Sequence, residues 1–404
     1  MVAVGSRGDV APYVGLGQRL HHADHRVAIA THAAFADMVR QTGLEWRDLS
    51  GDPRTLIRDR MRPQPDPRQA TAAFVSGIGE DITRAAQLGT DIILTCLGQA
   101  PLSYLVASAL GVPSMGVYLA PSVPTQEFLL PGATLTAGER GRMGNRAAGQ
   151  RLLDGARGIY AEVLPRLARR LCLPQVACDT VWDAWLGQSG WPISLGYSPA
   201  IVPRPVDWPP SVKVVGYWWP PLPPGWQPSP ELVEFLAAGE PPVFLGFGSM
   251  GVGHGQRLGP LIAHAVRTAG VRAVVQAGWA ELTVAAPNVL RIGDVPHEWL
   301  FPRMAAAVHH AGAGTTAAGL RAGLPTVAVP VMADQPFWAD RVHHLGAGPA
   351  PVPFADLTPE RLATTIREAL DQPRYRDRAT ELAHLINSED GADAVQTRIS
   401  NLTT

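Results

Sequence analysis

A glycine-rich stretch after a short apolar run is the first segment of the sequence with an evident chemical use. Residues 305–309 (AAAVH) read as a buried strand, and residues 309–316 read HHAGAGTT. Glycines let a backbone approach a ligand closely, and the start of the helix expected over 316–322 offers N–H groups and a positive dipole. With His310 as a further donor, the segment fits a diphosphate. The alternative is a tight turn that brings a helix close to a strand.

A second glycine-rich stretch, residues 246–251 (GFGSMG), follows the strand expected over 242–247. Its spacing matches a dinucleotide-binding fingerprint, but that fingerprint needs an acidic residue about 20 positions later. Residues 252–280 contain no Asp or Glu, which disfavours a nicotinamide or flavin. The pattern favours a turn that holds a phosphate through the backbone N–H groups of Gly248 and Ser249 and the Ser249 hydroxyl.

Polar side chains that could take part in chemistry follow two of the expected strands. Asp334 and Gln335 come directly after the strand expected over 325–330, and together they offer acceptors and donors for vicinal hydroxyls. Asp9 ends the loop after the first strand, where a carboxylate can take the proton of an attacking hydroxyl. Each has a structural alternative as a helix cap, with Pro336 at the first helical position in one case and Pro12 in the first turn in the other.

Several other chemistries lack the residues they need. The sequence contains no Walker loop, no D-x-D pair for a metal-bridged diphosphate and no G-x-S-x-G elbow. Lys213 is the only lysine, which leaves one candidate for lysine-dependent chemistry. Cys96, Cys172 and Cys178 are odd in number and form no C-x-x-C pair, which argues against a disulfide framework or a zinc site. We therefore expect neither a metal nor a tightly bound cofactor.

Strand and helix patterns alternate in both halves of the chain, which is typical of parallel sheets covered by helices. In the first half, strands are expected over 2–4, 27–30, 91–95 and 114–118, with helices over 12–22, 33–42 and 101–110. Thirteen of the 38 prolines lie within 199–242, and the alternation then restarts with strands over 242–247, 272–276, 289–292, 305–309 and 325–330.

These patterns predict two doubly wound α/β domains that face a cleft, with ligands at the carboxyl ends of the strands. The expected division is an N-terminal domain over 1–205, a proline-rich linker over 206–240, a C-terminal domain over 241–385 and a tail over 386–404 that returns to the N-terminal domain. Residues 120–170 break the alternation, and an insertion of this length is usually functional.

Composition narrows the class of protein. Of the 404 residues, 46% are apolar, and 34 basic residues balance 35 acidic ones, which excludes a disordered chain and disfavours nucleic acid or anionic lipid as a partner. The uncharged stretch 92–126 is interrupted by glycine and proline, so we expect no transmembrane segment. Without a secretory signal pattern, the expected location is cytoplasmic. The first strand is short, and we expect the natural start to lie upstream of Met1.

Five motifs lie at 5–12, 247–250, 295–302, 309–316 and 333–338. Their residues, order and spacing resemble those of the family 1 glycosyltransferases of GT-B fold. The likeness is strongest to the sterol 3-β-glucosyltransferase-like branch, which shades into bacterial natural-product glycosyltransferases. The resemblance covers nearly the whole chain. The departures are Ala311 and Ala333, where the branch usually has glycine.

The resemblance implies inverting, metal-independent transfer of a hexose from a nucleotide-diphosphate sugar, either UDP-glucose or a TDP-sugar, to a hydroxyl of a hydrophobic acceptor. It implies that Asp9 is the general base and that Val295 binds the nucleotide base through its backbone. The remaining donor residues are those expected at the diphosphate (Ser249, His310, Gly312, Gly314 and Thr315) and at the sugar (Asp334 and Gln335).

The acceptor is expected to lie in the N-terminal domain, against residues 120–149 and residues 59–74. Phe128, Leu129 and Met143 are the candidate contacts, because this segment is apolar and carries little charge. A sterol, a polyketide or another natural-product aglycone would fit equally well. The alternative function is a sugar-nucleotide-binding auxiliary protein or an epimerase on the same fold. An auxiliary would be expected to lack the base or the diphosphate loop, and both are present.

Overall fold

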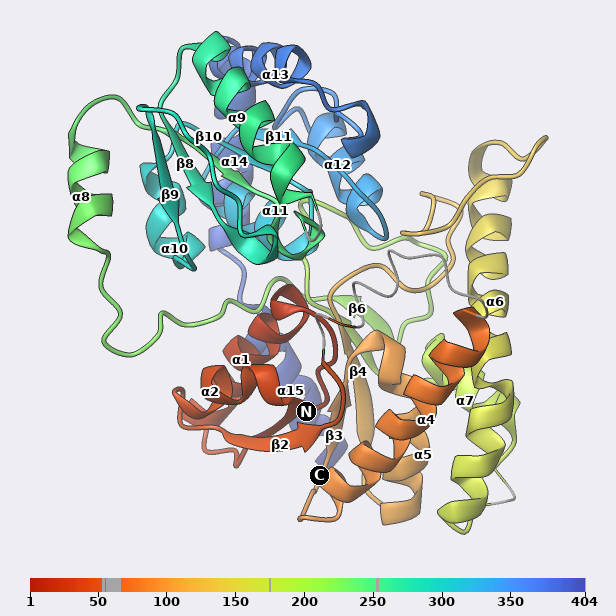
Figure 1. The fold of residues 1–404 in the computed structure, drawn as a ribbon. Helices are drawn as coiled ribbons and strands as arrows, with labels where there is room; N and C mark the ends of the chain where they lie inside the picture. The colour runs from red at the N-terminus through yellow and green to blue at the C-terminus, as the bar shows by residue number, and fades with distance from the viewer. Residues whose placement is uncertain (53–54, 56–66, 174–175, 252–253, 404) are drawn as a thin grey trace. The chain divides into compact units, whose positions relative to one another are not determined.

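The computed structural model describes residues 1–52, 55, 67–173, 176–251 and 254–403 (Figure 1). The chain forms two compact units. The first comprises Met1–Pro223 together with Glu389–Thr404, and the second comprises Pro224–Ser388. The segment expected as a linker, 206–240, is thus divided between the two units. Among the described residues, no helix combines the length and apolar character that a membrane span needs.

The sheet of the first unit is parallel throughout. Val2 makes parallel bridges to both Ala30 and Thr95, and so joins a two-stranded part to a four-stranded part. The two-stranded part pairs β1 (Ala28–His32) with β2 (Glu45–Leu49). The four-stranded part has the order β3 (Ile93–Thr95), β4 (Ser114–Tyr118), β5 (Ile193–Leu195) and β6 (Val212–Val214).

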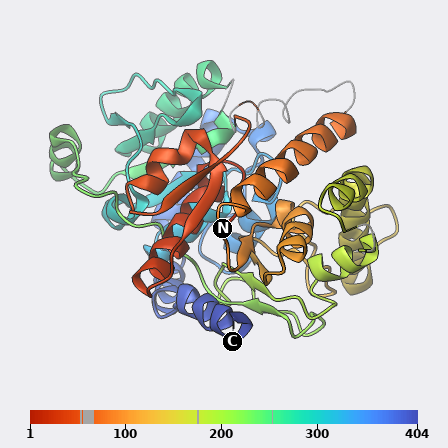
Figure 2. The ribbon, with the colours of Figure 1, turned by 90° about the horizontal axis from the view of Figure 1, so that it is seen from below.

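Helices connect these strands, and the last helix of the chain belongs to the same unit. In chain order they are α1 (Arg7–His22), η1 (Ala33–Phe35), α2 (Ala36–Arg40), α4 (Pro67–Ala86), η2 (Leu97–Gln99), α5 (Ala100–Leu110), α6 (Gly141–Arg170), α7 (Cys178–Trp185) and α15 (Gly391–Thr403). Helix α15 contacts α1, as Figure 2 also shows. The Arg398 guanidinium holds α15 to the sheet by donating to the carbonyls of Ile193 and Ser211.

The second unit contains a five-stranded parallel sheet of order β11-β10-β7-β8-β9. Its strands are β7 (Val243–Gly246), β8 (Ala273–Gln276), β9 (Val289–Ile292), β10 (Ala306–His309) and β11 (Thr326–Ala328). The chain moves outward from β7 through β8 to β9 and then returns to the other side of β7. The order therefore reverses between β7 and β10, and in open α/β sheets ligands bind outside the carboxyl ends of the strands at such a point.

The helices of the second unit cover both faces of its sheet. They are α8 (Pro230–Ala237), η3 (Gly248–Gly251), α9 (Gly255–Ala269), η4 (Gly278–Ala280), α10 (His297–Leu300), η5 (Phe301–Arg303), α11 (Ala313–Arg321), α12 (Gln335–His344), η6 (Phe354–Asp356), α13 (Pro359–Asp371) and α14 (Pro373–Asn387). Because both faces are covered, the strands read in the sequence as nearly continuous apolar runs.

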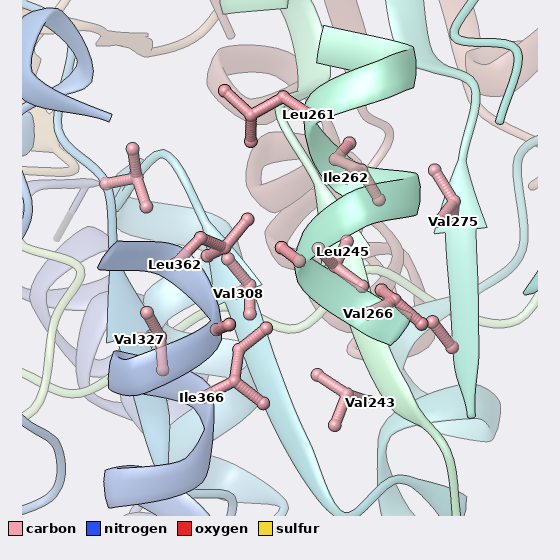
Figure 3. Packing of buried hydrophobic residues seen from close by; sticks show 14 of the residues in the cluster. Val243, Leu245, Leu261, Ile262, Val266, Val275, Val308, Val327, Leu362 and Ile366 are labelled. Atoms are coloured by element: carbon pink, nitrogen blue, oxygen red, sulfur yellow. The ribbon is translucent and has the colours of Figure 1, made fainter. Parts of the chain in front are cut away.

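The core on one face lies between the sheet and helices α9 and α13 (Figure 3). Successive side chains of a strand point to opposite faces, so Val243 and Leu245 of β7 face this core while Phe244 faces the other. From the helices, Ile262 and Val266 of α9 meet Leu362 and Ile366 of α13. Full burial of one such side chain stabilises the fold by roughly 1.5–3 kcal/mol, so this core fixes the sheet that carries the loops described next.

The beginning of the chain differs from the sequence expectation. The strand expected over 2–4 is reduced to the bridges of Val2, and the first helix begins at Arg7 rather than at 12. The cause is a capping box in which Ser6 and Asp9 satisfy each other's backbone N–H groups, so that helix formation extends back over the expected loop.

Candidate active site

The imidazole of His310 lies between two glycine loops of the second unit. Gly248, after β7, has a φ of +52°, and a Cβ added there would lie 3.1 Å from Cε1 of His310. A Cβ on Gly312, after β10, would lie 2.5 Å from Nε2 of the same ring. Both loops therefore need glycine, one for its backbone conformation and both for the space that the ring occupies.

The preceding histidine fixes the loop backbone. His309 is fully buried, and its Nδ1 accepts a hydrogen bond from the Ala311 N–H at 3.0 Å. This bond assigns the ring proton to Nε2. Burial, with the nearby His310 and His297, lowers the pKa of His309 well below its ordinary value, so the ring is neutral. The bond accompanies a left-handed backbone at Ala311, with a φ of +59°.

Helix α11 begins immediately after this loop. Gly312 is its N-cap, and the Thr316 N–H makes the first helical bond back to the Gly312 carbonyl. The N–H groups of residues 313–315 come before that bond, so they are the donors that a helix N-terminus offers to an anion. Burial lowers the pKa of His310 to about 4, although a hydrogen bond with the Gly246 backbone acts in the opposite sense. His310 is therefore a neutral partner at pH 7.

Gln335 is fixed in a single orientation beyond β11. Its Oε1 accepts hydrogen bonds from the N–H groups of Val331 at 2.9 Å and Met332 at 3.1 Å, and the side chain is only 4% exposed. Two donors on one atom identify that atom as the carboxamide oxygen. The amide nitrogen is thereby directed away from the loop backbone and is the donor that Gln335 offers.

Asp334 stands at the N-cap of α12, as the capping alternative predicts, but its side chain makes no capping bond. Instead, its Oδ2 accepts a hydrogen bond from Nε1 of Trp338 at 2.8 Å. Gln335 takes the first helical position and Pro336 the second, one place later than expected. The carboxylate is therefore held by an indole from the following turn.

The expected nucleotide-base position lies at the end of β9. Val295 is half-buried between β9 and α10. Beside it, Nε2 of Gln276, at the end of β8, lies 3.4 Å from Oδ1 of Asp294. Neither Gln276 nor Gly278 was predicted from the sequence, and a Cβ on Gly278 would lie 2.8 Å from the Gly248 carbonyl oxygen. The available signal was a glycine two positions after the strand expected over 272–276.

Most of the predicted donor residues are thus gathered by one sheet. They follow the carboxyl ends of β7, β9, β10 and β11, which lie at the same edge because the strands are parallel. Ser249 lies in η3 after β7, but its side chain is outside the described part of the structure. Gly314 and Thr315 form the first turn of α11.

Asp9 belongs to the first unit and is exposed at the third position of α1. Its Oδ2 accepts hydrogen bonds from the Ser6 N–H at 2.7 Å and the Ser6 hydroxyl at 2.8 Å. Gly5 has a φ of +140°, and a Cβ there would lie 2.4 Å from the same oxygen. The capping alternative therefore describes these bonds, which hold the carboxylate in one orientation.

A buried thiol lies near Asp9 in the first unit. Cys96, directly after β3, donates its S–H to Oε1 of Gln99 at 2.8 Å. Burial, with a contribution from the negative charge of Asp9, raises the pKa of Cys96 to about 12. The thiol is therefore protonated and unreactive.

The three predicted acceptor residues have different surroundings in the first unit. The half-buried Phe128 ring meets the edge of Trp208 with centroids 6.0 Å apart, whereas Leu129 packs against a cluster of Leu130, Ala133 and Ala148. Met143, on α6, is 73% exposed. Of the second expected segment, residues 59–66 lie outside the described residues.

Among the described residues, no three or more His, Cys, Asp or Glu side chains are arranged to hold a metal ion.

Comparison with known proteins identifies the family. Residues 1–90 match the glycosyltransferase family 28 N-terminal domain, and residues 264–402 match the C-terminal domain of erythromycin biosynthesis protein CIII-like proteins. The chain is 35% identical over 429 residues to the O-mycaminosyltylonolide 6-deoxyallosyltransferase of Streptomyces fradiae, covering 97% of this chain and 94% of that enzyme. The chain belongs to the family 1 glycosyltransferases.

This glycosyltransferase is also 35% identical over 412 residues to a sterol 3-beta-glucosyltransferase of Arabidopsis thaliana, covering 98% of this chain and 66% of the relative. The chain thus spans just under two thirds of the length of that plant enzyme. The solved glycotransferase of kitacinnamycin has the same fold, with a TM-score of 0.72 at 19% identity over 100% of this chain and 98% of that chain. The GT-B architecture predicted from the sequence is confirmed.

Proposed function

We propose that this glycosyltransferase moves a hexose from a nucleotide-diphosphate sugar to a hydroxyl of a hydrophobic acceptor, with inversion and without a metal. The observation that carries this proposal is the position of His310 between Gly248 and Gly312, at the N-terminus of α11. A neutral histidine beside a helix N-terminus is suited to an anion whose charge increases during the reaction.

The leaving diphosphate is proposed to bind at this loop. The N–H groups of residues 313–315 and the positive end of α11 neutralise its charge. His310 is a neutral ring with a single N–H, and we propose that it donates this N–H to the diphosphate in place of the Gly246 carbonyl. The sugar is proposed to bind next to it, with the amide nitrogen of Gln335 as donor and the Asp334 carboxylate as acceptor. Val295 is proposed to bind the nucleotide base.

The proposed reaction is a single displacement. The acceptor oxygen forms a bond to the anomeric carbon of the sugar, and Asp9 takes the hydroxyl proton as that bond forms. The bond from the anomeric carbon to the phosphate oxygen breaks, and its electron pair leaves with the nucleoside diphosphate. Attack opposite the leaving group inverts the anomeric configuration.

The acceptor is proposed to be a sterol or a natural-product aglycone. Two relatives support these classes, since one is named for a sterol and the other for a macrolide. The half-buried Phe128 and Leu129 of the first unit supply apolar surface that suits either class.

The decisive experiment incubates UDP-glucose and TDP-glucose with and without cholesterol and O-mycaminosyltylonolide. Sugar transfer that needs an acceptor supports the proposal. Conversion of the donor sugar without an acceptor would instead identify an epimerase, and donor binding without any turnover would identify an auxiliary protein. Added EDTA should leave the rate unchanged.

Substitution of Asp9, the proposed general base, tests the mechanism directly. Asp9→Asn should lower turnover by roughly 10²–10⁴-fold, the usual contribution of a general base, while nucleotide binding persists. Asp37→Asn is the control, because Asp37 is also exposed in the first turn of a helix of the same unit. Full activity of Asp9→Asn would remove Asp9 from the mechanism.

A further inference from the structure

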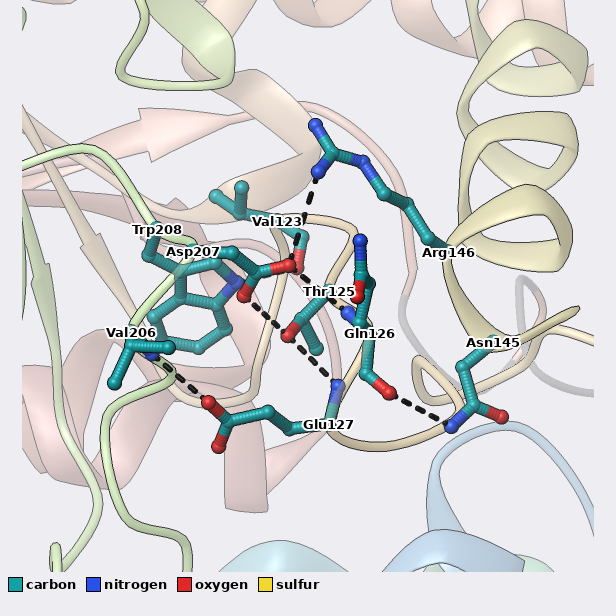
Figure 4. Close-up of polar contacts among 9 residues, drawn as sticks. All are labelled: Val123, Thr125, Gln126, Glu127, Asn145, Arg146, Val206, Asp207 and Trp208. Carbon is teal, nitrogen blue, oxygen red and sulfur yellow. Dashed lines mark hydrogen bonds and ion pairs between the residues drawn. The ribbon is translucent and has the colours of Figure 1, made fainter. Parts of the chain in front are cut away.

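The segment 123–128, which begins the insertion after β4, is held by a turn formed by residues 206–208 (Figure 4). The Thr125 hydroxyl donates to Oδ1 of Asp207 at 2.6 Å, and the Gln126 N–H donates to Oδ2 of Asp207 at 3.0 Å. Nε1 of Trp208 donates to the Val123 carbonyl at 2.8 Å. Residues more than 80 positions apart in the chain are thereby tied together.

The contact is reciprocal. The Val206 N–H donates to Oε1 of Glu127 at 3.0 Å, and the Glu127 N–H donates to the Thr125 hydroxyl oxygen at 3.1 Å. Each of the residues 125, 126 and 127 therefore takes part in the hydrogen bonds that hold this segment. Thr125 is fully buried, so its hydroxyl depends on these partners.

Helix α6 holds the same segment from a second side. Nδ2 of Asn145 donates to the Gln126 carbonyl at 3.2 Å, and Nη1 of Arg146 lies 3.9 Å from Oδ2 of Asp207. A Cβ on Gly149 would lie 3.2 Å from Cβ of Pro124, so the helix and the segment are in close contact. Both backbone polar groups of Gln126 are therefore used.

The turn that provides Asp207 is itself anchored. The Arg204 guanidinium donates to the carbonyls of Pro205, Trp208, Pro209 and Val212 at 2.7–3.0 Å. Since Val212 begins β6, the turn is fixed to the sheet. Movement of segment 123–128 therefore requires loss of the bonds to Asp207 rather than a shift of the turn.

Asp207 is the charged centre of this arrangement. Burial alone would raise the pKa of its carboxyl group, but hydrogen bonds from the Thr125 hydroxyl and the Gln126 N–H, with the charge of Arg146, outweigh burial and lower it. The group is a carboxylate at neutral pH. Its removal would leave the buried Thr125 hydroxyl and the Gln126 N–H without their acceptor, which is costly for buried groups.

Two side chains are displayed by the segment that Asp207 holds. The Phe128 ring packs edge to face against Trp208. The Gln126 backbone is hydrogen-bonded, whereas its carboxamide makes no hydrogen bond within the described residues. An apolar ring and an amide two positions apart suit a molecule with an apolar body and a polar substituent.

We propose that Asp207 is a positioning residue for the acceptor, which holds segment 123–128 so that Phe128 and Gln126 contact it. This inference rests on the proposed function, because it assigns a role in choosing the acceptor of that reaction. The acceptor class is a hydrophobic alcohol that carries a further polar group, and Gln126 is the residue that recognises this group.

The test compares Asp207→Ala, Asp207→Asn and Thr125→Val with the wild-type protein. Asparagine keeps one oxygen for the Gln126 N–H and a polar group for the Thr125 hydroxyl, so it should restore part of the lost function. Asp179→Ala is the matched control, because Asp179 also pairs with an arginine of α6, Arg157, but lies outside this arrangement. Steady-state kinetics with O-mycaminosyltylonolide and UDP-glucose or TDP-glucose gives separate constants for acceptor and donor.

Asp207→Ala should raise the acceptor KM about tenfold, the effect of one lost hydrogen bond to a charged group, with the donor KM and the acceptor-free hydrolysis of the donor unchanged. Thr125→Val should have a smaller effect in the same direction. An acceptor KM within twofold of wild type in Asp207→Ala, or an equal rise of both KM values, would overturn the inference.

A second measurement separates this inference from the proposed function. If the wild-type protein transfers no sugar, the proposed function fails, and equilibrium binding of O-mycaminosyltylonolide, followed by tryptophan fluorescence, replaces the kinetics. Tenfold weaker binding by Asp207→Ala than by Asp179→Ala supports the positioning role. Equal binding by the two variants, or no binding to the wild-type protein, refutes it.

Discussion

Ser6 donates both its backbone N–H and its hydroxyl to one oxygen of Asp9, at 2.7 and 2.8 Å. The residue proposed as general base is therefore also the N3 residue of a capping box whose N-cap is Ser6. The two roles make different demands, since capping needs both partners whereas proton transfer needs only the carboxylate.

Ser6→Ala should separate these roles. The variant loses the hydroxyl donor but keeps Asp9 and the backbone N–H of residue 6. We expect the free energy of unfolding to fall by about 0.5–2 kcal/mol, as for other N-cap losses, and kcat to fall by less than tenfold. Thermal unfolding and initial rates measure both quantities. A loss of turnover as large as in Asp9→Asn would contradict this division of roles.

Gly312→Ala tests the loop that is proposed to bind the diphosphate. Gly312 has ordinary backbone angles, so the substitution adds no backbone strain, but the new Cβ would lie 2.5 Å from Nε2 of His310 and must displace the ring. Nucleotide affinity, measured by calorimetry with UDP and TDP, should weaken about tenfold or more, since a hydrogen bond to the charged diphosphate is lost.

Gly319→Ala is the matched control for this variant. Gly319 lies in the same helix, and the nearest atom to an added Cβ is Oγ1 of Thr326 at 3.5 Å, an ordinary contact. Its nucleotide affinity should equal that of wild type. Equal weakening in both variants would show that the effect comes from α11 as a whole rather than from His310.

The sequence predicted the second unit well because its information is local. The strand over 289–292 is correct at both ends, and those expected over 272–276 and 305–309 begin one residue too early. Apolar runs between turn residues define buried strands. The glycine loops after β7 and β10 could be identified for the same reason, since a loop at a strand end carries its signal within a few residues.

Elements whose cause lies elsewhere in the chain were missed. Strand β2 carries Glu45, Arg47 and Asp48, and among the described strands it pairs with β1 alone, so it lacks the apolar run of a central strand. The role proposed for Asp207 depends on Thr125, 82 residues away in the chain. A local sequence pattern cannot indicate such a contact. The different surroundings of Phe128 and Met143 likewise follow from tertiary packing.

Three histidines with lowered pKa values predict the pH dependence of stability. Burial lowers the pKa of His32, His309 and His310 below their value in the unfolded chain, to about 4 for His310. As the pH falls from 6.5 to 4.5, the unfolded state takes up protons that the folded state does not, so stability falls with decreasing pH and is fully present above 6.5. Urea unfolding at several pH values measures the slope.

His310→Gln should reduce the slope of the free energy of unfolding against pH between pH 6.5 and 4.5. The reduction should correspond to about one proton fewer taken up on unfolding. The comparison uses slopes rather than absolute stabilities, so a loss of packing in the variant does not affect it. A slope equal to that of wild type would mean that His310 takes up its proton equally in both states.

The final prediction concerns Ala311 and Ala333. Both have left-handed backbones, with φ of +59° and +58°, which is unfavourable for a residue with a Cβ. Their surroundings differ. Ala333 is exposed, whereas the Ala311 methyl group is fully buried against Ala328 and Ala339. Ala333→Gly should therefore raise the free energy of unfolding by about 0.5–1 kcal/mol, since relief of strain exceeds the added flexibility of the unfolded chain.

Ala311→Gly should be nearly neutral. The same relief of strain is offset by the loss of a buried methyl group, which contributes about 0.8 kcal/mol. Urea unfolding of the two variants beside the wild type measures the difference. Equal stabilisation by both substitutions would mean that the Ala311 methyl group contributes nothing to packing. Destabilisation by Ala333→Gly would mean that the left-handed backbone is not strained there.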